Sequence, residues 1–259
     1  MQRYFYVGLF KLAGKWCLVS ELKNKFDFYI REKTKFSRKN YSPTPQNVSD
    51  LVPASEYDLT ILKKDITRQN CQENLYILDI LDKYFRIYPS ENLKVLDIGS
   101  KNWNYARGEY IFFKNNCHHL EMTGVELDAY RLCWNLFSRY EIARYNIKYL
   151  PFANYIADDF LNINGKFDYI TWFMPFLGEY QHKCWGLPMK YFNPKQMLLH
   201  AKECLVEGGA MFIVNQGETE FWLQKQLCDE LGLAYREIGV ISSEYSFYKY
   251  PHYALIVFW

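Results

Sequence analysis

Short apolar runs alternate with longer amphipathic segments over most of the chain. The runs lie at 93–99 (LKVLDIG), 122–128 (MTGVELD), 154–160 (NYIADDF), 166–176 (KFDYITWFMPF) and 210–216 (AMFIVNQ). Such runs are typical of strands buried on both faces of a parallel sheet. Helices are expected between them at 104–116, 129–150, 194–209 and 218–233. The alternation predicts a doubly wound α/β sheet with right-handed crossovers, and Gly208 and Gly209 are expected to end the helix over 194–209.

The end of the chain departs from this alternation. Two strand-like runs, 235–248 and 252–259, follow each other with no room for a helix between them. They must form a hairpin, which places one antiparallel strand in the sheet. We therefore expect an α/β fold with a doubly wound, seven-stranded, mostly parallel sheet, a C-terminal antiparallel hairpin and a helical N-terminal extension.

The first 40 residues differ from the rest in pattern and in charge. Apolar residues recur there at spacings of four and three, which predicts an amphipathic helix over 3–20: Phe5, Leu9, Leu12, Trp16 and Val19. The chain has a net charge of +2, but residues 1–40 carry ten Lys/Arg and three Asp/Glu, so the remainder is acidic. We expect this basic arm to pack on the domain and help close its site; binding to nucleic acid is the alternative.

Two further segments define the expected domain boundaries. Residues 41–55 are rich in Pro, Ser and other polar residues, as linkers are. Residues 57–87 have a broken apolar stripe and are expected to be helical up to Pro89. We divide the chain into a basic extension with linker, 1–56, and an α/β domain, 57–259, whose core is 93–259.

Composition excludes several classes of protein. The sequence holds no apolar run near the roughly 18 residues that span a bilayer, and we expect no signal peptide. Its seven cysteines are scattered and form no Cys-x-x-Cys pair, so we expect neither a zinc site nor a disulfide framework. A reducing cytoplasm is the expected location.

Acidic residues and one glycine stand at the ends of the expected strands. Gly99 ends the first strand, Glu126 the second, and Asp158 and Asp159 the third. Ligands of open α/β sheets bind beyond the carboxyl ends of the strands. A carboxylate at Asp97 would repel the pyrophosphate of a dinucleotide, whereas S-adenosylmethionine carries an ammonium and a sulfonium and no phosphate. The pattern favours S-adenosylmethionine over a nicotinamide cofactor, and with it methyl transfer over an oxidoreductase.

These motifs resemble those of the class I S-adenosylmethionine-dependent methyltransferases over residues 90–259. The resemblance lies in Asp97-Ile98-Gly99, in Glu126 of GVELD, in ADDF, in Phe167-Asp168 and in the terminal hairpin. The DIGSKN form is similar to that of an uncharacterised bacterial branch. The resemblance implies a Rossmann-like domain and these cofactor-binding residues: Asp97, Gly99, Ser100, Lys101, Asn102, Tyr105, Glu126, Leu127, Asp158, Asp159, Phe160 and Phe173.

Lys101 stands where the superfamily's first loop has further glycines. In this position it binds the methionine carboxylate of the cofactor, or it narrows the pocket and leaves a degenerate fold that acts as a binding or scaffold module. Both alternatives stay open.

The segment TWFMPF (171–176) follows the fourth strand, where the methyl acceptor of related enzymes lies. It lacks the Asp or Asn followed by Pro-Pro that amino methyltransferases of DNA carry, which disfavours that activity. Together with an insertion at 178–192 it is expected to form an aromatic, mostly apolar wall: Trp172, Phe173, Met174, Phe176 and Trp185, with Glu179 and His182 as its polar groups. Such pockets suit small molecules.

We therefore expect a small-molecule acceptor, methylated on oxygen or nitrogen; an RNA acceptor is an alternative. His182 is the candidate general base. The competing interpretation of His182 is an exposed loop histidine.

Overall fold

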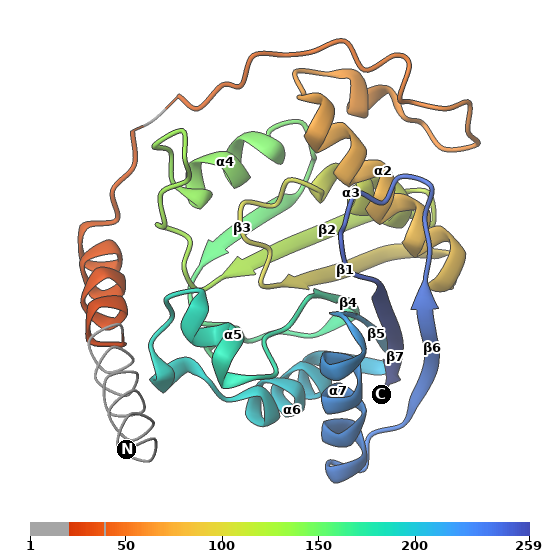
Figure 1. Cartoon of the computed structure of the whole chain (residues 1–259). Coiled ribbons are helices and arrows are strands. Elements are labelled where there is room, and N and C mark those ends of the chain that lie inside the picture. Colours follow the sequence, from red (N-terminus) through yellow and green to blue (C-terminus); the bar gives the residue numbers. More distant parts are fainter. Residues whose placement is uncertain (1–20, 39) are drawn as a thin grey trace, which may run out of the picture.

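The computed structural model describes residues 21–38 and 40–259, which form one seven-stranded sheet in the order β3-β2-β1-β4-β5-β7-β6 (Figure 1). The strands are β1 (Ser90–Ile98), β2 (Cys117–Glu126), β3 (Ala153–Ala157), β4 (Phe167–Phe173), β5 (Leu205–Gln216), β6 (Tyr235–Ile241) and β7 (His252–Phe258). Neighbours from β3 to β5 pair in parallel, whereas β7 pairs antiparallel with β5 and β6. The expected α/β fold with an antiparallel C-terminal pair is confirmed.

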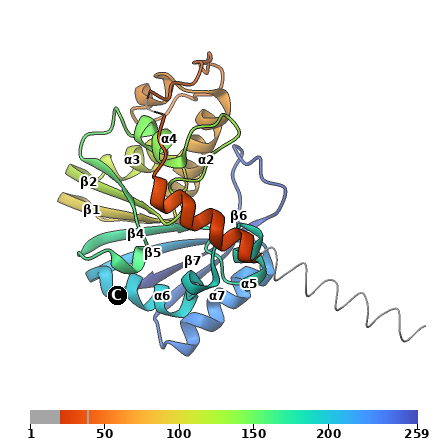
Figure 2. The same cartoon turned by 90° about the vertical axis from the view of Figure 1, so that its left-hand side faces the viewer.

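Helices cover both faces of the sheet (Figure 2). On one face lie α2 (Arg68–Tyr84), α3 (Ala106–Lys114) and α4 (Arg139–Asn146); on the other lie α6 (Pro194–Cys204) and α7 (Glu218–Glu230). Successive strand residues point to opposite faces, so Val95 packs in the first core and Leu96 in the second. Both faces of β1 are thus buried, which explains its continuous apolar run.

The helix expected over 129–150 is much shorter than that. α4 begins only after Ser138, and residues 129–137 are irregular, with Leu136 at a φ of 63°. The Ser138 side chain accepts a hydrogen bond from Glu141 N, while the Glu141 carboxylate accepts one from Ser138 N. This capping box fixes the start of the helix at Ser138, and the prediction for 129–138 was wrong.

Gly208 and Gly209 do not end a helix, contrary to expectation. α6 stops at Cys204, and the two glycines lie within β5, where the pairing with β4 shifts between Phe167–Leu205 and Tyr169–Ala210. Gly208 has a φ of 77°, and a Cβ on Gly209 would come within 2.8 Å of a backbone oxygen. The glycines therefore allow the irregular backbone at which the pairing of β5 with β4 shifts.

The helix expected over 57–87 is two separate helices. A short 3₁₀ turn, η1 (Thr60–Lys63), precedes α2, whose start is set by the Thr67 side chain accepting from Asn70 N. α2 ends at Tyr84, several residues before Pro89.

The helix over 21–34 lies across the carboxyl ends of the parallel strands (Figures 1 and 2). Irregular backbone follows this helix over 35–38 and 40–59. The helix predicted over 3–20 lies outside the described residues. Among residues 21–38 and 40–259, no helix combines the length and the apolar character needed to cross a membrane.

Candidate functional site

A cavity of about 110 Å³ opens at the carboxyl ends of the strands, next to β1 and β4. The chain order of the strands reverses between these two neighbours, which is where ligands of open α/β sheets bind. Gly99 lines the cavity with a φ of 72°, and a Cβ there would meet nothing within 4 Å. The backbone at Gly99 is therefore open to a ligand.

Glu126 provides the main hydrogen-bond acceptor of the cavity wall. It is 7% exposed, at the end of β2. Its Oε2 accepts from Lys101 N at 2.9 Å, and its Oε1 accepts from Asp128 N at 2.9 Å and from Arg139 Nη1 at 3.0 Å. A carboxylate offers about two acceptor positions on each oxygen, so capacity for a ligand hydroxyl remains on Oε2, beside Lys101 N.

Two cations of the wall lie beneath one tryptophan. The Lys101 ammonium is 4.9 Å from the centroid of the Trp185 ring, and the Arg139 guanidinium carbon is 5.4 Å from it. Burial, reinforced by Arg139, lowers the pKa of Lys101. Arg131 donates to the Trp185 carbonyl. Trp185, which follows α5 (Glu179–Cys184), is thus held over the cavity by cation–π and hydrogen-bond contacts.

Asp128 connects the cavity to the N-terminal helix. Its side chain is completely buried and pairs with Arg131 from the same loop. Arg31 of the helix over 21–34 adds a bidentate contact, Nε to Oδ1 at 2.9 Å and Nη2 to Oδ2 at 3.2 Å. Two arginines therefore compensate one buried carboxylate.

Asp97 lies beneath the cavity in a closed polar network. It accepts from the Tyr105 hydroxyl at 2.9 Å and from Thr171 Oγ1 at 3.2 Å. Thr171 Oγ1 also lies 2.7 Å from Glu109 Oε1, and Trp103 Nε1 donates to the other Glu109 oxygen at 2.7 Å. Both carboxyl groups are completely buried. Burial, with the Glu109 charge second, raises the pKa of Asp97, and burial raises the pKa of Glu109 to about 7.

The end of β3 contributes a short turn. Asp158 accepts from Asp159 N at 2.7 Å and from Asn162 Nδ2 at 2.8 Å, and Asp159 caps η2 (Phe160–Asn162). Both aspartates and Phe160 line the cavity.

Aromatic side chains form the opposite wall. Trp172, Phe173, Met174, Phe176 and Trp185 all line the cavity. The chain leaves β4 at Met174, which has a φ of 56° and donates its N–H to a β5 carbonyl. The apolar and aromatic residues named for this wall from the sequence are brought together, whereas Glu179, named as one of its polar groups, does not line the cavity.

His182 is not an exposed loop histidine: it is 4% exposed, on α5. Its Nε2 lies 3.0 Å from the Pro188 carbonyl, which requires a proton on Nε2 and leaves Nδ1 as the acceptor. Burial lowers the pKa of His182, so the ring is neutral near pH 7. Glu179, by contrast, is exposed and pairs with Lys183.

The cavity gathers most of the residues expected to bind a cofactor. Those that line it are Gly99, Lys101, Glu126, Leu127, Asp158, Asp159, Phe160 and Phe173, and His182 lines it too. Asp97, Ser100, Asn102 and Tyr105 do not line it. Ser100 bonds to the Val125 carbonyl, and Asn102 accepts through its carbonyl from Asn146. Direct contact of these four with a ligand stays a prediction.

Arg139 and Arg131 line the cavity but have no place in the sequence-based prediction. The sequence does contain a signal for Arg139. The pattern Ser138-x-x-Glu141 predicts a helix start that places Arg139 in the first turn of α4, and there it pairs with Glu126 at the end of β2.

No family model matches the sequence, and no curated protein matches it either. Solved structures are similar to it. An S-adenosylmethionine-dependent methyltransferase from Aquifex aeolicus has a TM-score of 0.50 at 13% identity, covering 78% of this chain and 98% of that one. The chain has a Rossmann-like methyltransferase fold.

Two further methyltransferases are similar. A methyltransferase from Pyrococcus furiosus has a TM-score of 0.48 at 16% identity, and the matched region covers 80% of this chain and 87% of that one. Magnesium protoporphyrin IX methyltransferase from Synechocystis PCC 6803, solved with S-adenosylmethionine, has a TM-score of 0.46 at 12% identity and covers 79% and 87%.

Proposed function

We propose that the chain is an S-adenosylmethionine-dependent methyltransferase. The observation that carries this proposal is the position of the Glu126 carboxylate beside open backbone at Gly99, in a cavity at the β1–β4 reversal. Arg139 and Arg131 are engaged by Glu126 and Asp128, so these two cations are not available to a pyrophosphate. When bound, S-adenosylmethionine supplies a methyl group activated by its sulfonium.

The residues of the wall divide among the parts of this cofactor. Glu126 accepts hydrogen bonds from the ribose hydroxyls, as acids at the end of the second strand do. Lys101 pairs with the methionine carboxylate, which offsets the cost of its burial. Asp158 and Asp159 face the adenine edge. Asp97 acts from below by fixing Tyr105 and, through it, the start of α3.

A thermal-shift comparison of S-adenosylmethionine, S-adenosylhomocysteine, NAD and NADP tests the cofactor. A ligand that binds only the folded state stabilises it by about 2.7 kcal/mol at a hundredfold excess over its Kd. We expect such stabilisation from the two adenosyl compounds. Stabilisation by NAD alone would refute the proposal, and no shift with any of the four would favour the degenerate binding module.

Replacing the ribose ligand gives the first mutational prediction. Glu126→Ala should weaken S-adenosylmethionine binding by about 1–3 kcal/mol, because a charged acceptor is lost. The change also leaves Arg139 buried without its partner, so the fold must be checked by circular dichroism, and Glu126→Gln provides a milder variant that keeps one acceptor. Calorimetry supplies the affinity. Glu121→Ala, an exposed acid on the same strand, is the control, and equal affinity of all three variants would contradict the assignment.

The aromatic wall supports a small-molecule acceptor methylated on oxygen or nitrogen. The His182 ring centroid lies 6.3 Å from that of Phe176 and 5.3 Å from that of Phe192, and the Trp185 ring packs on Phe176 at 5.5 Å. Ligands of this kind bury most of their area against such side chains. His182 is the proposed base, because Nδ1 is its free acceptor and its neutral form prevails near pH 7.

His182→Ala should lower turnover by about a hundredfold, since a positioned base contributes at least that much. The assay measures release of S-adenosylhomocysteine with panels of phenols and amines. His182→Gln separates the base from a structural role, because the amide still donates to the Pro188 carbonyl but does not take up a proton near pH 7. Full turnover in the Gln variant would exclude the base role, while cofactor affinity should be unchanged in both.

A further inference from the structure

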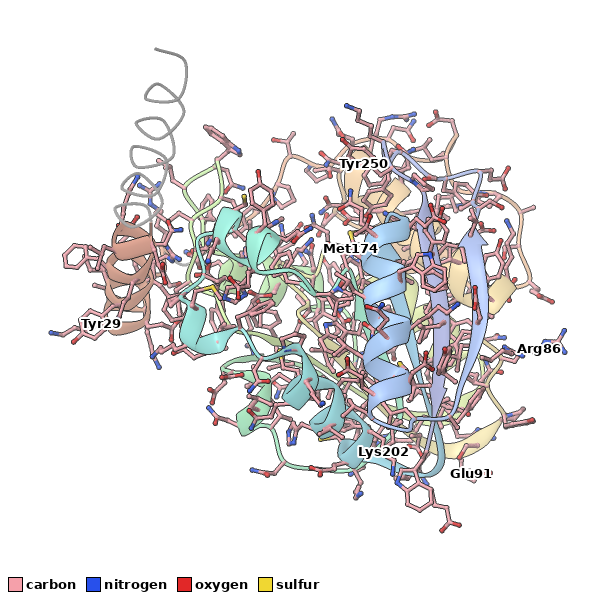
Figure 3. The ribbon with its side chains drawn as sticks, turned by 60° about the horizontal axis from the view of Figure 1, so that its bottom comes forward. Tyr29, Arg86, Glu91, Met174, Lys202 and Tyr250 are labelled. Carbon is pink, nitrogen blue, oxygen red and sulfur yellow. The ribbon has the colours of Figure 1, made fainter. Side chains whose placement is uncertain are left out.

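One face of the helix over 21–34 exposes a row of large apolar side chains. Leu22 is 67% exposed, Phe26 63% and Tyr29 60%. Their spacing of four and three residues puts them on one side of the helix. Tyr29 lies on the side that faces away from the sheet (Figure 3).

The opposite face of the same helix is held to the domain. Phe28 is 3% exposed and its ring centroid lies 5.2 Å from that of Tyr191. Arg31 binds Asp128, and Asn24 Nδ2 donates to the Lys183 carbonyl at 3.1 Å. The helix is therefore already packed on the domain through this face. The exposed apolar row lies on the other side of the helix and is not the face that contacts the core.

The fully exposed charges around this row are of one sign, while Glu32, which lines the groove beside it, is partly buried. The exposed charged residues within 21–38 are all basic: Lys23, Lys25, Lys33, Lys35 and Arg38. Its three acids, Glu21, Asp27 and Glu32, are partly buried. A helix with large apolar side chains flanked by exposed lysines is typical of segments that lie in a membrane interface.

A groove of about 630 Å³ runs beside the apolar row. Leu22, Phe26 and Tyr29 line one side, and Pro188 and Tyr191 line the other. Lys25 and Lys190 belong to its lining as well, which puts positive charge next to apolar surface. The combination fits the boundary between acyl chains and anionic headgroups.

We propose that this face docks on an anionic lipid bilayer, with Leu22, Phe26 and Tyr29 inserted into the interface and the lysines at headgroup level. The site is independent of methyl transfer. A nucleic-acid duplex pairs with the lysines but leaves the three apolar side chains exposed to water, because its binding rests on phosphate contacts. A second copy of the chain would bring two rows of lysines together. In sequence, the same apolar spacing continues upstream through the stripe at residues 5–19.

Vesicle binding by the full chain tests this proposal. Flotation with phosphatidylcholine vesicles is compared with vesicles that contain roughly 30% phosphatidylserine, at about 0.1 M salt. We expect binding to the anionic vesicles that weakens as salt rises. Lys25→Glu with Lys33→Glu should reduce it by more than about 20-fold, because each lysine near such a surface contributes roughly fivefold. Leu22→Ser with Phe26→Ser and Tyr29→Ser should reduce it at least roughly tenfold.

A matched variant removes exposed apolar surface elsewhere: Tyr88→Ser, Phe152→Ser and Tyr250→Ser, at side chains that are 84%, 67% and 54% exposed. It should bind vesicles like the unchanged chain, and thermal unfolding verifies that every variant is folded. The proposal fails if the unchanged chain ignores anionic vesicles, or if the apolar triple variant binds them normally. Salt-sensitive RNA binding without vesicle binding, or a dimer in sedimentation that the triple variant abolishes, would also overturn it in favour of those partners.

Discussion

Two carboxyl groups share one buried network beneath the cavity, and only one of them was expected to matter. Asp97 and Glu109 both contact the hydroxyl of Thr171, and neither is exposed. Two carboxyl groups that contact the same hydroxyl do not both ionise readily in a low-dielectric interior. At least one proton is therefore kept in this network near neutral pH, which makes folding stability depend on pH.

The pKa of Glu109 sets the direction of that dependence. Burial raises it to about 7 from an ordinary value of 4.5. The folded chain holds a proton that the unfolded chain releases, so the stabilisation is fully present below pH 4.5 and is lost as pH rises through about 7. Glu109→Gln should flatten the fall in unfolding free energy between pH 5 and pH 8, by on the order of 1–3 kcal/mol. Urea unfolding at a series of pH values between about 5 and 8 measures this change of the unfolding free energy with pH.

Glu203→Gln is the control for this experiment, since its side chain is 74% exposed. Its pH profile should match that of the unchanged chain. An unchanged slope in Glu109→Gln would show that folding does not raise the pKa of Glu109.

Residues that end a strand could be placed from the sequence, whereas their partners could not. Gly99 and Glu126 follow apolar runs, and the carboxyl ends of neighbouring parallel strands meet at one edge. Arg139 reaches Glu126 only because the chain takes an irregular path through 129–137, and no periodicity encodes that path. The burial of Asp97 under Tyr105 likewise depends on tertiary packing, so a motif match did not reveal that its carboxylate faces the core.

At the scale of elements, α4 has a start that holds several functional contacts. Ser138 caps it, the next residue is Arg139 of the cavity wall, and Glu141 accepts a hydrogen bond from Arg38 N of the N-terminal segment. A long helix from residue 129 would have placed Arg139 elsewhere. The capping box at Ser138 thus determines where the helix starts, although the amphipathic pattern predicts an earlier start. Hydrogen bonds from side chains to the backbone commonly end helices in this way.

Removing the cap should be measurable. Ser138→Ala should lower the unfolding free energy by about 1–2 kcal/mol, because the first-turn N–H of Glu141 loses its acceptor in a buried setting. Urea unfolding tests this. Ser246→Ala, at an exposed serine, should change it by less than about 0.5 kcal/mol. Equal effects of the two substitutions would mean that packing alone fixes the start of α4.

At the scale of the whole molecule, the N-terminal helix and the cover of the cavity are one connected unit. The helix over 21–34 reaches the buried Asp128 through Arg31 and the segment around α5 through Asn24 and Phe28. Trp185 in turn lies over Lys101 and Arg139. Opening the cavity and releasing the helix are therefore expected to be coupled motions.

Arg31→Ala tests this coupling. The variant removes a bidentate, charge-assisted contact, so local opening of 24–34 should become easier and its amide exchange about 10- to 100-fold faster. Amides of 183–187 should speed up with it, because Asn24 and Phe28 no longer stay in place. Global unfolding should change less, since Arg131 still neutralises Asp128. Lys23→Ala, on the exposed face, serves as the control in the same hydrogen-exchange measurement. Faster exchange in 24–34 with unchanged exchange in 183–187 would show that the arm moves without the cover, and the helix would then be an attachment to the domain rather than part of its closure.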